Sequence, residues 1–235
     1  MISAIGFDAD DTLWQNEAWF RLTQERFTDL LRDYADPHRL HERLLAAERR
    51  NIGAYGFGVK GFTLSMIETA IEVTEGRVPA SVISELLGSG RAMLDHPVEL
   101  LPHARETVQA LAGRFRLILI TKGDLLHQER KLAQSGLGDF FDAVEIVSDK
   151  TPQVYQRIFA RHGSGADRAL MTGNSMKSDV VAAIDAGAWA VHVPHGPAWE
   201  LESADEPAEN PRYRSLPDLS GLPGLVEELA ASPWE

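Results

Sequence analysis

The stretch from residue 102 to 193 alternates short apolar runs with segments of helical periodicity, and this alternation restricts the possible folds more than any other feature. The apolar runs predict a buried strand at 115–120 and further strands at 141–147, 169–172 and 188–193. The helical segments lie at 102–113, about 125–135, 152–162 and 177–186. Strands that alternate with helices pair in parallel, because each crossover carries the chain back across a face of the sheet. The pattern therefore predicts an α/β fold whose parallel sheet is sandwiched by helices.

One more strand is expected at the start of the chain, and a helical block separates it from the others. Residues 4–7 form a short apolar run. Between residues 15 and 97, apolar side chains recur every three or four positions, with a glycine-rich break at 53–61 and no strand pattern. We therefore expect a Rossmann-like α/β core made of residues 1–14 and 98–235, with an all-helical domain of four or five helices inserted at 15–97.

Three carboxylates and a threonine follow the first predicted strand directly: Asp8, Asp10, Asp11 and Thr12. Ligands of open α/β sheets bind at the carboxyl ends of the strands. In an extended chain the side chains of Asp8 and Asp10 leave on the same side, where a divalent cation would relieve their repulsion. A hard ion such as Mg²⁺ fits this stretch best, since the chain has no cysteine. The stretch alone is also compatible with an acidic turn that caps the next helix.

Polar clusters also follow three of the later strands. They consist of Thr121 and Lys122, of Lys150, and of Asn174, Ser175 and Asp179. Each cluster has an ordinary structural interpretation: Lys150 as a solvated surface lysine, and Asn174 or Asp179 as residues that begin a helix. Because parallel strands end at one edge of the sheet, however, all of these side chains are expected near Asp8. Four clusters at four strand ends favour a functional site over four separate coincidences.

The four clusters, in this order and each after a strand, resemble the four motifs of the haloacid dehalogenase superfamily. The resemblance covers essentially the whole chain, and the helical block stands where that family carries its helical cap of the first type, between the first and second motifs. It implies a hydrolase of the phosphatase type that uses Mg²⁺ and forms an aspartyl-phosphate. It also implies that the helical domain is a mobile cap over the α/β core.

The resemblance implies catalytic roles for the matching residues. Asp8 is the nucleophile, and Asp10 is the general acid for the leaving alcohol and then the base for the attacking water. Thr121 holds the transferring phosphoryl oxygens, with Lys122 beside it as a further substrate contact. Lys150 bridges Asp8 and the phosphate. Because Asp10 has to carry a proton at the start, we expect burial and the neighbouring Asp8 to raise its pKa.

The metal ligands that the resemblance implies are Asp8, the backbone carbonyl of Asp10, Asp179 and Asn174. Two positions depart from the usual motifs. The family most often has glycine where Asp11 stands, and it often has aspartate where Asn174 stands. An amide carries no charge, so we expect Asn174 to be the weaker ligand and Asp179 to supply the charged contact.

Substrate choice in this family rests largely with the cap and its hinges. Lys60, in the glycine-rich stretch, is a candidate contact for an anionic group of the substrate remote from the phosphate. Trp14, just after the first motif, is a candidate for lining the cleft beside a hinge. Both residues also have ordinary interpretations, as a loop lysine and as a packing aromatic.

Composition narrows the partners and the location. The chain has 23 basic and 35 acidic residues and a net charge of −12, so its overall field disfavours nucleic acid. It shows no signal-peptide pattern and no apolar run long enough to span a membrane. We therefore expect a cytoplasmic protein, a monomer or a homodimer, whose partner is a small-molecule phosphate ester.

Asp10 also separates reaction classes. Members of the family that act as dehalogenases lack this residue, because a halide leaving group needs no proton, so its presence favours a phosphate ester. Two alternatives stay open. A phosphomutase can share the same core residues, and a low-activity phosphate-binding or regulatory protein can keep the same fold.

Overall fold

The computed structural model describes residues 2–197 and 199–231. The chain divides into two compact units. The α/β unit comprises Met1–Glu17, Val98–Lys122 and Gln128–Glu235, and the helical unit comprises Ala18–Pro97 and Gly123–His127. Relative to the boundaries expected from the sequence, residues 15–17 join the α/β unit and residues 123–127 join the helical unit.

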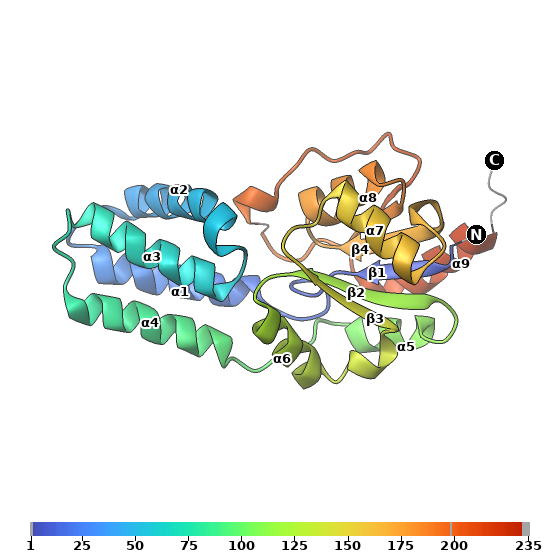
Figure 1. Ribbon diagram of the computed structural model, residues 1–235, viewed down its shortest axis with the longest axis horizontal. Coiled ribbons are helices and arrows are strands. Elements are labelled where there is room, and N and C mark those ends of the chain that lie inside the picture. The colour runs from blue at the N-terminus through green and yellow to red at the C-terminus, as the bar shows by residue number, and fades with distance from the viewer. Residues whose placement is uncertain (1, 198, 232–235) are drawn as a thin grey trace. The chain divides into compact units, whose positions relative to one another are not determined.

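The α/β unit is built on one parallel sheet, which confirms the predicted fold class (Figure 1). The strands in the described part of the chain are β1 (Ala4–Phe7), β2 (Arg116–Lys122), β3 (Ala143–Val147), β4 (Ala169–Gly173), β5 (Trp189–His192) and β6 (Tyr213–Ser215). Their order is β3-β2-β1-β4-β5-β6, and every pairing is parallel. The order changes direction at β1, which lies between β2 and β4. Such a switch point is where α/β sheets bind ligands.

Helices cover both faces of this sheet. Ile5 and Phe7 of β1 pack on one face with α5 (Ala104–Leu111) and α9 (Leu222–Ala231). Ala4 points to the opposite face, where α7 (Pro152–His162) and α8 (Ala182–Asp185) form a second core. The alternation follows from the two-residue period of a strand. Burial on both faces explains why the central strands β1, β2 and β4 form continuous apolar runs, whereas the edge strand β3 is only partly buried.

The helix predicted at 177–186 differs from the structure in its first turn. Residues Met176–Val181 form a turn of π-helix, and α8 continues from Ala182. The wide turn is closed by the Val180 N–H, which donates to the Ser175 carbonyl at 3.2 Å. Single π turns are frequent at functional sites, because they shift side chains relative to a regular helix.

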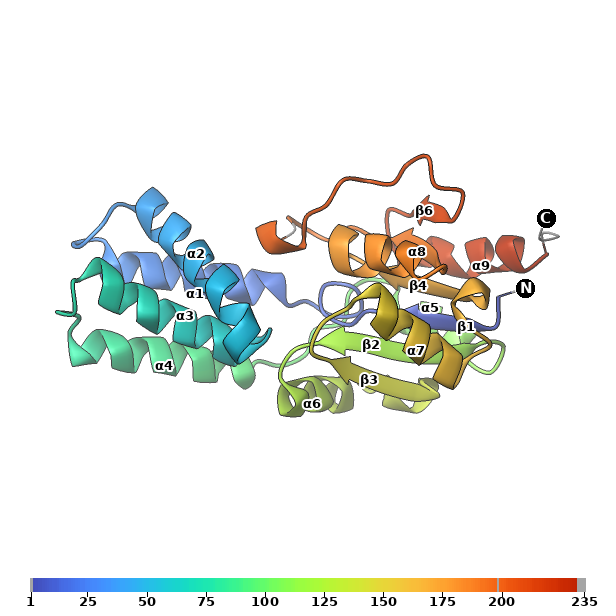
Figure 2. The same cartoon turned by 45° about the horizontal axis from the view of Figure 1, so that its top comes forward.

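The helical unit contains α1 (Glu17–Leu31, whose first residue belongs to the α/β unit), α2 (Pro37–Tyr55), α3 (Val59–Val73) and α4 (Ala80–Leu94) (Figure 2). All four helices contribute to one apolar core. The glycine-rich break predicted at 53–61 is shorter than expected, since α2 and α3 extend to Tyr55 and Val59. Gly56 and Gly58 supply the positive φ angles, 76° and 115°, that the connection needs. Among the described residues, no helix combines the length and apolarity needed to cross a bilayer.

Candidate active site

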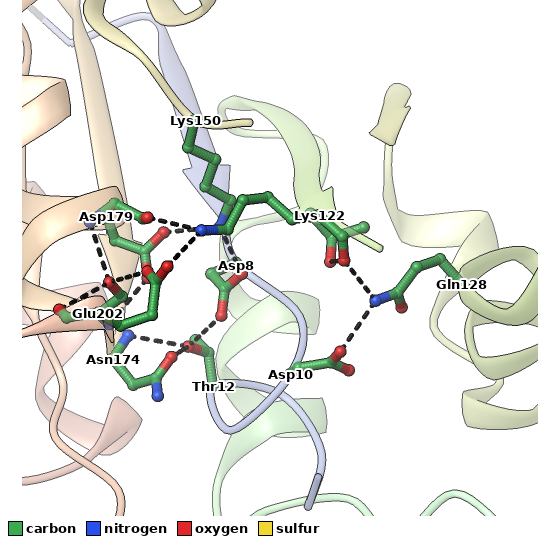
Figure 3. Close-up of polar contacts among 12 residues, drawn as sticks. Asp8, Asp10, Thr12, Lys122, Gln128, Lys150, Asn174, Asp179 and Glu202 are labelled. Carbon is green, nitrogen blue, oxygen red and sulfur yellow. Dashed lines mark hydrogen bonds and ion pairs between the residues drawn. The ribbon is translucent and has the colours of Figure 1, made fainter. Parts of the chain in front are cut away.

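Three charged side chains from three strand ends meet at the carboxyl edge of the sheet (Figure 3). Asp8 follows β1, Lys150 follows β3, and Asp179 lies in the π-helical turn after β4. Lys150 Nζ donates to Asp8 Oδ1 at 2.5 Å and to Asp179 Oδ1 at 2.6 Å. The lysine side chain is only 2% exposed. The structure therefore holds one cation between two carboxylates, out of contact with water.

Burial and the shared lysine determine the charges of this cluster. Burial and then the charge of Asp179 raise the pKa of Asp8 to about 7, although Lys150 acts in the opposite direction. Burial lowers the pKa of Lys150, but the two carboxylates outweigh it, and the pKa of Lys150 is raised. Lys150 is therefore protonated. One lysine does not neutralise two buried carboxylates, so a further cation would stabilise the cluster.

The second oxygen of Asp8 faces other oxygen atoms. The Thr12 hydroxyl donates to Asp8 Oδ2 at 2.9 Å and accepts from the Asn174 N–H at 3.1 Å. One terminal atom of the Asn174 amide lies 3.2 Å from Asp8 Oδ2 and 3.2 Å from the Asp10 carbonyl oxygen. If this atom is the amide nitrogen, it donates to both oxygens. If it is the amide oxygen, three acceptors face one another and require a cation between them.

These oxygens fit a hard divalent ion. Mg²⁺ binds oxygen at about 2.0–2.1 Å in octahedral geometry, which places neighbouring ligands about 3.0 Å apart. Within the described residues no three carboxylate or imidazole side chains form a metal cage, so a site here would depend on the Asn174 amide and the Asp10 carbonyl. Asp179 is placed differently, because its oxygens accept from Lys150 and from the Ser175 N–H at 2.9 Å. Direct ligation by Asp179 stays a prediction that this geometry does not favour.

The Asp10 carboxylate is held by three donors. Lys131 Nζ lies 2.5 Å from Oδ1 and the Trp14 indole N–H 2.6 Å from the same oxygen, while the Gln128 amide donates to Oδ2 at 2.8 Å. Burial raises the pKa of Asp10, but Lys131 and the two neutral donors outweigh it, and the pKa is lowered. The expectation of a raised pKa is therefore wrong for this arrangement. It considered Asp8 and burial but not the cation supplied by a distant helix.

Two residues of this cage escaped sequence reasoning. Gln128 and Lys131 are buried residues of α6 (Leu125–Ser135). Three positions apart, they lie on one face of the helix, and that spacing is the signal that marks them in retrospect. Trp14 was predicted to line a substrate cleft. It is fully buried in the apolar core, so in this structure it contacts Asp10 rather than the surface of a cleft.

Lys122, at the end of β2, has a carboxylate partner that the sequence did not predict. Its Nζ lies 2.6 Å from Glu202 Oε1 and 2.7 Å from Ser178 Oγ, and Glu202 Oε2 accepts from the Ser175 hydroxyl at 2.6 Å. Burial raises the pKa of Glu202, but Lys122 and the hydroxyl donors outweigh it, and the pKa is lowered. Thr121 beside Lys122 is buried, with its hydroxyl 3.4 Å from the Lys122 carbonyl oxygen.

Asp11 shows why glycine is usual at this position of the motif. Its φ is 59°, in the left-handed region that glycine adopts freely and aspartate tolerates. Its carboxylate accepts from the Asn16 N–H at 2.9 Å and from the Glu17 N–H at 2.9 Å. Aspartate at this position therefore adds a cap at the beginning of α1.

Lys60 lies in the helical unit, in the first turn of α3. Its Nζ is 3.2 Å from Asp124 Oδ1, and its backbone N–H donates to Asp124 Oδ2 at 3.3 Å. The lysine side chain is 57% exposed. The structure thus gives Lys60 an acidic partner in its own unit, and a substrate contact by Lys60 stays a prediction.

Known proteins resemble this chain along most of its length. A family model for haloacid dehalogenase-like hydrolases matches residues 2–187. A solved haloacid dehalogenase-like family hydrolase from Xanthomonas campestris is 44% identical, with a TM-score of 0.87 and coverage of 98% of this chain and 92% of that chain.

More distant relatives differ in their named activities. The glyceraldehyde 3-phosphate phosphatase of Methanothermobacter thermautotrophicus is 23% identical over 206 residues, which are 82% of this chain and 86% of the relative. An L-2-haloacid dehalogenase from Xanthobacter autotrophicus is 20% identical, with a TM-score of 0.66 and coverage of 97% and 99%. At that identity the dehalogenase shows a shared fold alone.

Proposed function

The chain belongs to the haloacid dehalogenase-like hydrolases, and from that premise we propose that it hydrolyses a small phosphate monoester with Mg²⁺, through a phosphorylated Asp8. The observation that carries the proposal is the buried Lys150, in contact with both Asp8 and Asp179. A curated relative that is a phosphatase supports the phosphate class of substrate.

The proposed nucleophile faces an electrostatic obstacle. At about 3.5 Å and an effective dielectric constant of about 20, a carboxylate and a phosphate dianion repel each other by on the order of 9 kcal/mol. Lys150 offsets part of this repulsion, because it is protonated and touches the attacking carboxylate. Asp8, the Asp10 carbonyl and Asn174 are the residues that would hold Mg²⁺, which would supply two further positive charges to offset the repulsion. Thr121, at the end of the neighbouring strand, is the proposed hydroxyl contact of the same oxygens.

Asp10 is the proposed proton donor for the leaving oxygen. Its contacts define what has to change first, because Lys131 holds it as a carboxylate in this structure. It must release Lys131 and bind a proton before it can protonate an alcohol, and the resulting carboxylate can then activate the attacking water. A halide leaving group needs no such acid, so Asp10 supports a phosphate ester as the substrate.

The helical unit is the proposed cap of this enzyme. In the proposal it excludes water during phosphoryl transfer and opens to release the products. Lys60 is its proposed contact for an anionic group remote from the phosphate. Lys60→Ala tests this role. An unchanged substrate profile and an unchanged KM would contradict a substrate contact by Lys60.

The central test is phosphate release from a panel of small phosphate esters, including glyceraldehyde 3-phosphate, with Mg²⁺ and with chelator. Wild-type protein and Asp8→Asn are compared, since the amide is isosteric but a poor nucleophile. We expect release that needs both the metal and Asp8, with a loss of about 10³-fold or more in the variant.

Other outcomes point to the alternatives. Isomerised phosphate without free inorganic phosphate indicates a phosphomutase. A folded protein that binds Mg²⁺ but transfers no phosphoryl group from any ester contradicts the phosphatase proposal and indicates a binding or regulatory protein.

A further inference from the structure

Lys122 crosses the end of the strand that carries the nucleophile. It lies on β2, and its Nζ reaches Ser178 in the turn after β4. Since β1 lies between β2 and β4, the side chain passes in front of the carboxyl end of β1, which Asp8 follows (Figure 3). Lys122 is therefore close to the place where the proposed substrate phosphate meets Asp8.

The closer carboxylate partner of Lys122 comes from outside the four motifs, whereas Asp149 Oδ1 lies farther from Lys122 Nζ, at 3.8 Å. Glu202 ends the 3-10 turn Glu200–Glu202, in the long connection between β5 and β6. Both carboxylate oxygens have donors, Lys122 on one and the Ser175 hydroxyl on the other, each at 2.6 Å. The Glu202 side chain is 14% exposed. A lysine and a hydroxyl that converge on one carboxylate form an arrangement that would bind a phosphate or a carboxylate of a ligand equally well.

The other lysines of the site differ in one respect. Lys150 contacts Asp8 and Asp179, and Lys131 contacts Asp10. These carboxylates belong to the proposed catalytic machinery, so replacing any of them also changes the proposed chemistry. Glu202 has no role in that machinery and lies on a surface connection, so it is the partner whose departure leaves the proposed chemistry intact.

We propose that Lys122 and Ser175 form an anion-binding subsite that Glu202 fills, and that an anionic group of the substrate takes the place of Glu202. The proposal rests on the proposed phosphatase function, because it concerns the same site. The anion is either the transferring phosphoryl group or a second anionic group of the same substrate. Glu202 thereby lowers the affinity for anions that cannot displace it and makes the subsite selective.

A purely structural ion pair is the competing explanation. Buried ion pairs contribute little net stability once their desolvation is counted, and a structural pair would not couple to phosphate binding. The two explanations therefore predict different ligand affinities rather than different stabilities.

Binding of inorganic phosphate, measured by calorimetry in the presence of Mg²⁺, tests the subsite without any turnover. While Glu202 occupies Lys122, phosphate cannot bind there. The apparent affinity for phosphate is therefore the intrinsic affinity multiplied by the fraction of protein in which Glu202 has left the subsite. If the phosphoryl group is the anion that displaces Glu202, we expect Glu202→Gln to tighten phosphate binding about fivefold or more, and Lys122→Met to weaken it. In a Lys122→Met background the Glu202→Gln change should have no effect.

A matched control separates the subsite from bulk charge. Glu227 forms an exposed ion pair with Arg114, so Glu227→Gln changes the net charge by the same amount as Glu202→Gln. The phosphate affinity of Glu227→Gln should equal that of the wild type. If Glu202→Gln fails to fold, Glu202→Asp keeps the charge but shortens the reach by one methylene, and it should tighten phosphate binding by a smaller factor.

A pair of esters identifies the displaced group. Glyceraldehyde 3-phosphate and 3-phosphoglycerate differ in an aldehyde and a carboxylate. If the phosphoryl group displaces Glu202, Glu202→Gln binds inorganic phosphate and both esters more tightly than the wild type, by the same factor. If a second anionic group displaces Glu202, the affinity of Glu202→Gln for inorganic phosphate is unchanged and only the affinity for 3-phosphoglycerate rises. The affinity is read from KM or, where there is no turnover, from the dissociation constant.

Two results overturn the proposal. One is unchanged or weaker binding of all three anions in Glu202→Gln, and the other is equal tightening in the Lys122→Met background. Absence of hydrolysis with the expected phosphate coupling would instead contradict the phosphatase function and leave the subsite standing.

Discussion

Asp8 and Asp10 stand two residues apart, yet the two sides of the loop after β1 give them opposite electrostatic surroundings. On the side of β3 and β4, Asp8 shares Lys150 with a second buried carboxylate, and its pKa rises to about 7. On the side of α6, Asp10 accepts from Lys131 and from two neutral donors, and its pKa is lowered. The two sides differ in the number of cations for each carboxylate.

The largest effect is expected on the Asp8 side. Lys150→Met leaves two buried carboxylates without a cation, and removal of one partner from a buried pair costs about 3–5 kcal/mol. Urea unfolding in chelator measures the change at neutral pH. Lys150→Arg, which keeps the charge, should lose less. A Lys150→Met protein within about 1 kcal/mol of the wild type would contradict the shared-lysine description.

A proton and a metal ion should compete for Asp8. Ligation needs a deprotonated carboxylate, and the pKa of Asp8 is about 7 without metal. The Mg²⁺ affinity should therefore rise roughly tenfold per pH unit up to pH 7 and level off above it. Calorimetric titration between pH 5 and 8 measures this, with Asp8→Asn as the control that should bind weakly throughout. A Mg²⁺ affinity that stays constant over that pH range would contradict a pKa of about 7 for Asp8.

A smaller change in stability is expected on the Asp10 side. Lys131→Met removes the cation but leaves Trp14 and Gln128 as donors, so the expected loss is about 1–3 kcal/mol. The pKa of Asp10 should rise, because Lys131 is what lowers it. Asp10 then stays protonated to higher pH, and the basic limb of the pH profile of kcat should shift to higher pH. An unshifted limb would show that Lys131 does not control the charge of Asp10.

Asp11 is a third carboxylate of the same loop, and it differs from Asp8 and Asp10 because backbone N–H groups rather than a lysine hold it. The smallest effect is expected here. Asp11→Gly keeps the positive φ and loses the cap, so the expected change is a few tenths of a kcal/mol. Asp11→Ala loses the cap and strains the backbone, for about 2 kcal/mol. Thermal unfolding of the two variants measures the difference. Equal losses would mean that the left-handed conformation carries no strain.

The sequence predicted much of the sheet and part of the site, because both depend on local patterns. The apolar runs located β2 to β5, and the helix predicted at 152–162 matches α7. Asp8, Lys150 and Asp179 were found because residues at the ends of parallel strands meet at one edge. The π-helical turn at 176–181 was missed, since the hydrophobic period of one turn does not distinguish it from an α-helix.

The amino-acid sequence by itself determined the α/β class, the inserted helices and the positions of the strand-end carboxylates and lysine. Tertiary structure alone decided which cation each carboxylate receives. Asp10 meets Lys131 across 121 residues of chain, and Lys122 meets Glu202 across 80. Charges act through space and burial acts through packing, so the pKa of a side chain depends on neighbours that no local pattern reveals.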